Sequence, residues 1–531
     1  MNERHQTLHN AIFNALGRFF SIALSFFFMP YIVHELGPEA YGIYILIFAV
    51  IGYFGLLDLD LGQAIIKYVA EYKALDDFRG INRVVGATLF LYLLMGIIGG
   101  LTVFFCADLI ACRFLKIQHD LLPMARFTFR VASLGFVFTM LLSAFSSIPK
   151  ALNRYDISSK LTIVVSLVTT LSTVLLLYLH FGLREIVILD VVISFSSLIV
   201  YMIIGKRLLP QIRYRPYVDP IALKKVLPFG LYSSLGRISY IIQFQLDRIF
   251  TGVILGASSV TFYFVPFNLV SKAVTLTSQL SGVIMPLVSG LDGKKDFDSL
   301  IRVYLKSSRL IAAIASSVCL PLFLFGDRFL SLWMGEEFAR ESGSVLMFIT
   351  LALYADAFTN IPSFVVQGLG KPKITGFFAM ANAVINLTLL FPLARIMGLN
   401  GIALAFLISS AGIAPVFIYY ANNRVLHFSF ARLLREGYAL PVTGTLLVGL
   451  PLSFFPTGWV DNIFVLLAMM GAVTVLYLLI SIWIGAFTRD ELTQFKDYVQ
   501  GSFRRLRTLF RKGTSGQMKD RTGTLGDQPK P

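Results

Sequence analysis

Residues 84–106 read VVGATLFLYLLMGIIGGLTVFFC and contain no charged side chain. A helix rises about 1.5 Å per residue, so a stretch of this length can cross the roughly 30 Å hydrocarbon core of a bilayer. Similar stretches recur along the chain of 531 residues, of which 56% are hydrophobic and 14% are charged. Soluble domains contain roughly 25% charged residues. The sequence therefore predicts an all-α, polytopic membrane protein.

Charged, proline-rich and glycine-rich segments divide the chain into about fourteen predicted transmembrane spans. The expected spans are 11–32, 41–62, 84–106, 123–147, 161–179, 186–205, 229–254, 260–288, 308–326, 343–366, 374–393, 401–420, 439–455 and 462–485. If the N-terminus is cytoplasmic, the cytoplasmic loops carry 23 Lys and Arg residues and the opposite loops carry 7. This bias predicts cytoplasmic N- and C-termini. It also accounts for the net charge of +16 without a nucleic-acid partner.

Two parts of the sequence resemble each other. Leu16-Gly17-Arg18 recurs as Leu235-Gly236-Arg237, and the same offset of 219 residues relates Leu36-Gly37 to Leu255-Gly256. Each copy would hold six spans, so the copies have the same orientation and are related by an axis along the membrane normal. We therefore expect two pseudo-symmetric six-helix bundles plus two C-terminal helices, an architecture that suits alternating access around a central cavity.

The repeat gives a division of the chain into five parts. The parts are the N-terminal bundle (1–205), a cytoplasmic amphipathic linker (206–228), the C-terminal bundle (229–421), helices 13 and 14 (422–486) and a basic, partly disordered cytoplasmic tail (487–531). The tail alternates basic and apolar residues over 503–512, a pattern that favours an amphipathic helix at the membrane surface.

Several charged or polar residues lie within predicted spans, where a charge costs about 2.5–3.5 kcal/mol on insertion scales and usually faces the protein interior. Arg18 and Arg237 occupy equivalent places in the two repeats. Two arginines beside one cavity favour an anionic cargo, and a diphosphate fits because arginine binds phosphate oxygens bidentately. Further candidates for substrate binding are Arg248, Lys272, Gln243 and Gln279.

Four aspartates are candidates for ion coupling or for salt bridges. Asp58 and Asp60 would lie near the cytoplasmic end of the second span, where they could form salt bridges between helices. Asp247, together with Arg248, could instead extend to water at the outer end of the seventh span. Asp356 lies in the tenth span, where an acid could bind a proton or sodium ion.

The sequence contains no Walker loop, HExxH motif, GxSxG motif or CxxC pair, and the longest internal loops have about 20 to 25 residues. A catalytic domain therefore has no place in the chain. Three cysteines and six histidines have no metal-ligand spacing. We predict a protein that is not an enzyme, with no catalytic residue, no metal and no cofactor.

Three sequence segments carry a resemblance to a known family. They are LGPEAYG at 36–42, continued by GYFGLLDLDLG at 52–62; Leu246-Asp247-Arg248 with the following Gly256, Val260 and Tyr263; and QGLGKP at 367–372. They resemble the Wzx-type O-antigen and exopolysaccharide flippases, which are polysaccharide biosynthesis proteins of the multidrug/oligosaccharidyl-lipid/polysaccharide (MOP) exporter superfamily. The resemblance covers almost the whole transmembrane region.

The resemblance implies a bacterial inner-membrane flippase that moves undecaprenyl-diphosphate-linked oligosaccharide to the periplasmic leaflet. Its implied partners are the lipid-linked substrate, membrane lipids and a polysaccharide polymerase or other assembly proteins. Members commonly have twelve spans and lipid II flippases have fourteen, in which the extra pair helps to form a groove for the lipid tail. A lipid II flippase, a cation-coupled multidrug exporter and a non-transporting scaffold remain as alternatives.

Overall fold

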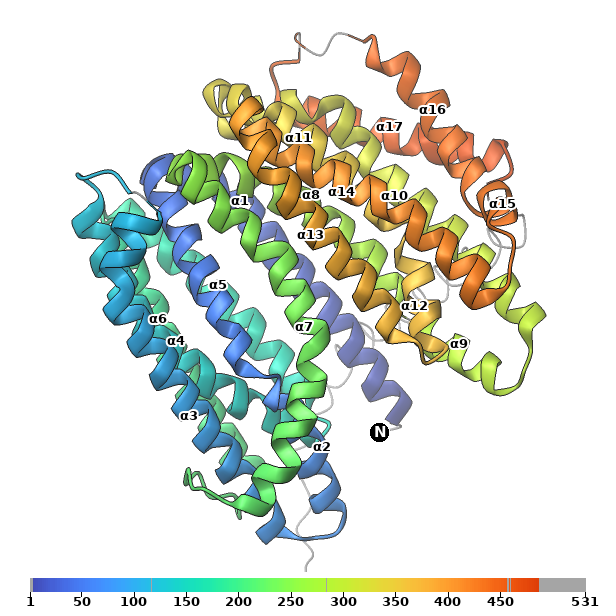
Figure 1. The fold of residues 1–531 in the computed structure, drawn as a ribbon. Coiled ribbons are helices and arrows are strands. Elements are labelled where there is room, and N and C mark those ends of the chain that lie inside the picture. The colour runs from blue at the N-terminus through green and yellow to red at the C-terminus, as the bar shows by residue number, and fades with distance from the viewer. Residues whose placement is uncertain (1–2, 116, 283, 456–457, 459, 487–531) are drawn as a thin grey trace, which may run out of the picture.

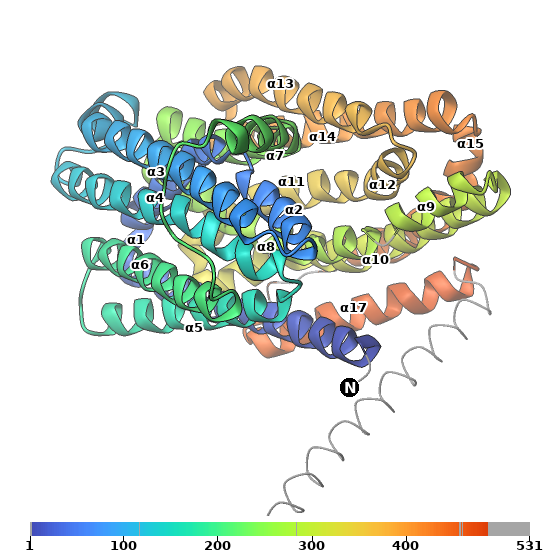
Figure 2. The same ribbon diagram turned by 90° about the horizontal axis from the view of Figure 1, so that it is seen from below.

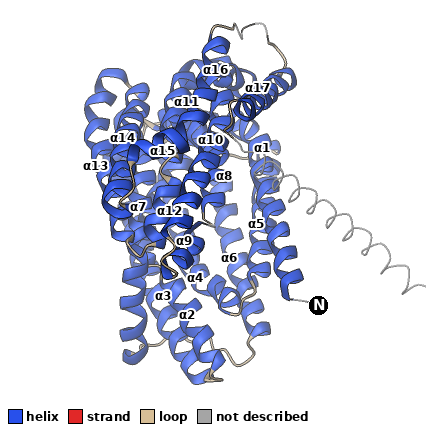
Figure 3. Ribbon diagram, turned by 90° about the vertical axis from the view of Figure 1, so that its right-hand side faces the viewer, coloured by secondary structure: helices blue, strands red, loops and turns tan. Residues whose placement is uncertain are grey.

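The computed structural model describes residues 3–115, 117–282, 284–455, 458 and 460–486, and within these ranges it leaves the side chains of residues 3–22, 232–233, 235–245 and 276 undescribed. The described chain is helical and contains no strand (Figure 3). Eleven described stretches are long and apolar enough to cross a membrane. The prediction of an all-α, polytopic membrane protein is therefore confirmed.

The described residues of the first half of the chain form six α-helices, one short 3-10 helix (η1) and one short π-helix (η2). These elements are α1 (Glu3–Phe54), η1 (Gly55–Asp58), α2 (Leu61–Ala74), α3 (Phe78–Asp108), η2 (Leu109–Phe114), α4 (Leu122–Ala151), α5 (Tyr155–Tyr178) and α6 (Leu183–Leu208). Helix α1 covers the first predicted span and most of the second, because only a break at Gly37 divides it.

Eleven further α-helices lie in the described part of the second half. They are α7 (Pro220–Leu255), α8 (Ala257–Ser281), α9 (Ile284–Gly293), α10 (Phe297–Met334), α11 (Glu336–Ala357), α12 (Asn360–Gly368), α13 (Pro372–Met397), α14 (Leu399–Tyr420), α15 (Phe430–Leu433), α16 (Ala439–Ser453) and α17 (Ile463–Trp483), with η3 (Ala421–Leu426) and η4 (Leu434–Tyr438) on either side of α15. Each predicted span overlaps helical residues, and the spans 41–62, 260–288 and 343–366 each extend across the junction between two helices. The number of full crossings stays a prediction, because the 15 residues of α16 measure only about 22 Å as a helix.

Glycines with positive φ make the tight connections between successive helices. Gly37 (φ 76°) breaks α1, and Gly256 (φ 92°) joins α7 to α8. Gly335, between α10 and α11, and Gly398, between α13 and α14, also have positive φ. A Cβ atom disfavours this backbone region, so glycine allows each pair of helices to reverse direction within about one residue. The repeated Leu-Gly pair in the sequence is therefore a repeated hairpin.

The helices pack into two groups, which Figure 1 shows from the side and Figure 2 from below. In the first group, α4 packs against α3 and α6, and α1 packs against α5. In the second group, α10 packs against α11 and α13 against α14, while α16 and α17 cover α10. Helix α7 contacts both groups, through α1 and α2 on one side and α8 and α13 on the other.

The hydrophobic cores show how the two groups are joined. One core combines Ile43 and Leu46 of α1 with Val260 of α8 and residues of α10 and α11. Away from it, each group has a separate core, one around Tyr92 and the other around Tyr304. The groups therefore share a core near the Gly37 and Gly256 hairpins and have separate cores towards α2 and α9, each of which lies at the lower end of its own group in Figure 1.

Candidate functional site

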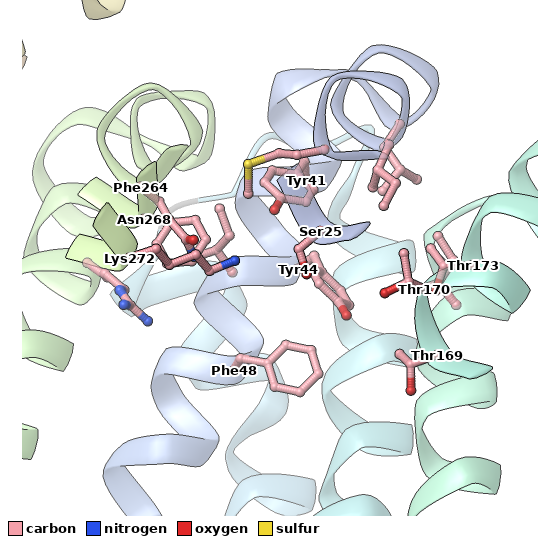
Figure 4. Close-up of a pocket in the computed structure, with 16 residues that line it drawn as sticks. Ser25, Tyr41, Tyr44, Phe48, Thr169, Thr170, Thr173, Phe264, Asn268 and Lys272 are labelled. Carbon is pink, nitrogen blue, oxygen red and sulfur yellow. The ribbon is translucent and has the colours of Figure 1, made fainter. Parts of the chain in front are cut away.

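A cavity of about 320 Å³ lies where both groups of helices contribute side chains. Helix α8 places Phe264, Asn268 and Lys272 at four-residue intervals, so all three lie on one helical face (Figure 4). Helix α7 contributes Arg248, whose guanidinium carbon lies 4.4 Å from the centre of the Phe264 ring. This cation–π contact positions the arginine while leaving its charge at the cavity. We call this space the central cavity.

The opposite wall comes from the first group of helices. The part of α1 before the break supplies Ser25, and the part after it supplies Tyr41 and Tyr44. Helix α5 adds three threonines, and Figure 4 shows them facing the α1 tyrosines across the cavity. The remaining lining residues are Met29, Ile32, Leu36, Ile45, Phe48 and Ile186.

The described lining of the central cavity is cationic and rich in hydroxyl groups. Arg248 and Lys272 supply positive charge, and none of the described residues that line the cavity is an aspartate or glutamate. Asp190 of α6 accepts a hydrogen bond of 3.1 Å from the Tyr44 hydroxyl behind this wall. Such a surface can bind an anion through its cations and neutral polyols through its hydroxyl and aromatic groups.

The structure brings together only some of the substrate-binding residues that the sequence suggested. Arg248 and Lys272 line the same cavity, whereas Gln279 is exposed and is not part of the described lining. Arg18, Arg237 and Gln243 lie on α1 and α7, but their side chains are outside the described residues. Their role in binding stays a prediction.

Asp247 is not part of the described lining of the central cavity, although its neighbour Arg248 is. Its side chain is buried with 4% exposure, so it does not extend to water as the structural alternative supposed. Its carboxylate accepts a 2.8 Å hydrogen bond from the Asn386 amide of α13 and a 3.3 Å bond from the Tyr263 hydroxyl of α8. Both donors are neutral, and the buried amide oxygen of Asn386 has no hydrogen-bond partner in the described structure.

The other aspartates occupy separate environments. Asp58 is buried and accepts hydrogen bonds from Tyr92 (2.6 Å) and Ser143 (3.4 Å), while Asp60 caps the start of α2 with a positive φ. Asp356 lines a second, polar cavity of about 200 Å³ among α11, α12, α13 and α14. None of these three aspartates belongs to the described lining of the central cavity.

Sequence reasoning missed most of the uncharged residues of the central cavity. These are Ser25, Tyr41, Tyr44, Thr169, Thr170, Thr173, Phe264 and Asn268. The four-residue spacing of Phe264, Asn268 and Lys272 was visible in the sequence and could have identified the α8 face. The α5 threonines carried no comparable signal, because isolated threonines in a span usually bond to their own helix.

The chain is similar to a known protein family, to other protein sequences and to solved structures. The model of the family described as polysaccharide biosynthesis protein matches residues 36–343. A Shigella flexneri protein named as an O-antigen transporter is 23% identical over 413 residues, which are 75% of this chain and 94% of that protein.

Two solved structures share the fold. The lipid II flippase MurJ in an inward closed conformation has a TM-score of 0.66 at 15% identity and covers 89% of this chain and 99% of its own. An inward-facing multidrug resistance MATE family transporter of the MOP superfamily has a TM-score of 0.66 at 17% identity, with 76% and 93% covered.

The family model spans more than half of the chain, and it begins at the Leu36-Gly37 motif on which the sequence resemblance rested. The relatives and the family are transporters and flippases, so the prediction that this chain is not an enzyme is confirmed on that ground. The chain belongs to the polysaccharide biosynthesis protein family, and its fold is similar to those of a MATE family transporter and of MurJ.

Proposed function

We propose that this protein is a flippase that moves an undecaprenyl-diphosphate-linked oligosaccharide, an O-antigen or exopolysaccharide repeat unit, from the cytoplasmic to the periplasmic leaflet. The observation that carries the proposal is the central cavity between the two helix groups, which has two cations and no carboxylate in its described lining. In this proposal Lys272 and Arg248 bind the diphosphate, because ammonium and guanidinium groups donate several hydrogen bonds to phosphate oxygens.

The uncharged lining supports a carbohydrate attached to that diphosphate. Tyr41, Tyr44 and the α5 threonines offer hydroxyl groups and ring faces to sugar hydroxyls and sugar rings. A volume of about 320 Å³ lies at the lower end of the range for small-molecule sites, so it suits the diphosphate and the first sugar. The remaining sugars require the groups of helices to move apart.

The arrangement of the cores supports alternating access. The two groups share a core near the Gly37 and Gly256 hairpins and have separate cores at the other end, an arrangement in which the separate ends can part first. Since Lys/Arg-rich loops lie at the end with separate cores, we propose that this end is cytoplasmic and that both termini are on that side of the inner membrane.

Further parts of the proposal concern residues outside the described lining. Arg18 precedes Ser25 by seven residues and Arg237 precedes Arg248 by eleven, which are about two and three helical turns. We propose that they extend the cationic path for the diphosphate, that α16 and α17 form a groove for the polyprenyl tail, and that a polysaccharide polymerase receives the product.

The first test is deletion of the gene in its host. We expect loss of surface polysaccharide together with accumulation of undecaprenyl-diphosphate-linked glycan on the cytoplasmic leaflet. Arrested cell-wall synthesis with normal surface polysaccharide would support the lipid II alternative instead. Unchanged levels of both glycans would refute the flippase proposal and favour the drug-exporter or scaffold alternative.

The second test assigns the cargo to the cavity. Returning a Lys272→Gln variant to the deletion strain should lower the transport rate about 10- to 150-fold, because a hydrogen bond to a charged group contributes about 1.5–3 kcal/mol. Lys294→Gln, which removes an exposed charge after α9, is the matched control and should transport normally. Equal transport by the wild type and Lys272→Gln, at equal membrane levels, would exclude this role for Lys272.

A further inference from the structure

A second cationic site lies away from the central cavity, at the start of α3 and the end of α6. Two adjoining cavities there have volumes of about 840 and 900 Å³. They share Lys206, Arg213 and Arg215 in their linings, so they adjoin at these three side chains. We call these two adjoining cavities the basic pocket.

The connection between α6 and α7 forms one wall of the basic pocket and is held in place by hydrogen bonds. The Asn82 side chain of α3 accepts a 2.7 Å bond from the backbone N–H of Arg213 and donates a 3.1 Å bond to the Gln211 carbonyl. The Lys206 ammonium donates a 2.8 Å bond to the Ile212 carbonyl. The backbone that carries the arginines is therefore fixed against α3 and α6.

Positive charge dominates this wall. Six cationic side chains line the two cavities: Arg79, Arg83, Lys206, Arg207, Arg213 and Arg215. No described lining residue is acidic. One ion pair is described for these six side chains, and it joins Arg83 Nε to Asp219 Oδ2 at 3.6 Å. Like charges repel one another in a shared space, so an anion that binds among them relieves an unfavourable interaction.

Membrane orientation explains why basic residues are on this side of the protein, but it does not require a cavity. Scattered Lys and Arg side chains on separate loops would produce the same bias. Here the cations come from two helix ends and a fixed connection, and they line two adjoining cavities. Cations gathered in this way can bind an anion.

An apolar surface leads from the basic pocket along α6. Phe195, Ile199 and Ile203 are each more than 40% exposed and follow one another at four-residue intervals, and Arg207 continues the same series. Side chains at this spacing lie on one face of a helix. Ile203 also lines the pocket, so the apolar face and the cations are continuous.

We propose that the basic pocket binds the phosphate headgroup of an anionic phospholipid, with an acyl chain along the Phe195–Ile203 face of α6. A free phosphate would need the cations but not the apolar face. A lipid uses both, because its phosphate lies at the membrane surface directly above its acyl chains. The site lies at the connection between the two helix groups and is separate from the central cavity, so the inference does not rest on the proposed function.

The experiment is native mass spectrometry of the purified full-length protein with phosphatidylglycerol and phosphatidylethanolamine. The test variant is the triple substitution Arg207→Gln, Arg213→Gln and Arg215→Gln. The control removes three exposed charges beside α9 and α10 by Lys294→Gln, Lys295→Gln and Arg302→Gln, so both variants have the same net charge. A triple Arg→Lys variant at the first three positions retains the charge if the glutamine variant does not fold.

The wild type, the control variant and the lysine variant should retain phosphatidylglycerol in preference to phosphatidylethanolamine. The triple glutamine variant should bind phosphatidylglycerol about 100-fold more weakly, since each basic residue near a membrane surface contributes roughly a factor of five in anionic-lipid affinity. Equal retention of the two lipids by the wild type, or equal weakening by the control variant, would overturn the proposal. A site that binds inorganic phosphate or pyrophosphate but retains no phospholipid would also overturn it.

Discussion

Gly42 lies at the contact that joins the two groups of helices, and substituting it should open that contact. A Cβ atom on Gly42 would overlap the carbonyl oxygen of Ala257 and lie 3.1 Å from the Thr261 hydroxyl oxygen. The same hydroxyl donates a 2.6 Å hydrogen bond to the Pro38 carbonyl. Because the overlapping atom belongs to the backbone of α8, no side-chain rotation can remove the overlap, and α1 and α8 must move apart.

The size of the effect follows from this geometry. Overpacking by one methyl group in a tightly packed contact costs about 1–3 kcal/mol. If that cost falls only on the conformation in which the hairpins touch, the population of the separated conformation rises about 5- to 150-fold. Thr261→Val removes the bond to Pro38 without adding bulk, and should shift the population in the same direction by about 2- to 13-fold, equivalent to roughly 0.5–1.5 kcal/mol.

The assay is the reactivity of a buried cysteine with a membrane-impermeant maleimide. The native cysteines Cys106, Cys112 and Cys319 are first replaced. Val260→Cys then places a single thiol in the shared core, where the Val260 side chain has no exposed surface. Gly42→Ala should accelerate labelling within the range given above. Gly412→Ala is the matched control, because a Cβ there has no neighbour within 4 Å, and it should label at the original rate.

A clear result would refute this reasoning. If Gly42→Ala and Thr261→Val both elute as folded protein and label at the rate of the parent, the contact between the hairpins does not limit separation of the helix groups. The relation between the shared core and alternating access would then have to be abandoned, whatever the transport rate of the variants.

Two further substitutions test the buried aspartates. Tyr92→Phe removes the 2.6 Å hydrogen bond to Asp58 and should lower the free energy of unfolding by about 1.5–3 kcal/mol, measured as a lower melting temperature in detergent. The control Tyr178→Phe changes an exposed tyrosine and should leave the melting temperature unchanged. Equal melting temperatures for the two variants would contradict this prediction. Asp247→Asn keeps the shape of the carboxylate but removes its charge, so, if Asp247 couples transport to a cation, flipping in proteoliposomes should lose its response to an imposed sodium or proton gradient. An unchanged response would exclude Asp247 as the coupling site.

The sequence by itself determined that most of the chain lies in lipid and that its fold is helical. Long apolar stretches can satisfy their backbone hydrogen bonds in lipid only as helices, so the span at 84–106 predicted α3 from composition alone. The repeated Leu-Gly pairs predicted two related halves through their common offset of 219 residues, and Gly37 and Gly256 both have the positive φ of a tight connection between helices. The LGPEAYG segment at 36–42 indicated the family by resemblance, and the family model matches from residue 36 onwards.

Tertiary structure alone decided which polar residues meet. Asp247 and Arg248 are neighbours in sequence, yet one bonds to Asn386 within the second group and the other lines the central cavity, because adjacent residues on a helix point about 100° apart. The approach of Tyr44 to Lys272 across the cavity and of Arg215 to Arg79 in the basic pocket depends on how the helices pack. No periodicity within one helix contains that information, because each helix records only which of its faces is polar and not which other helix lies opposite.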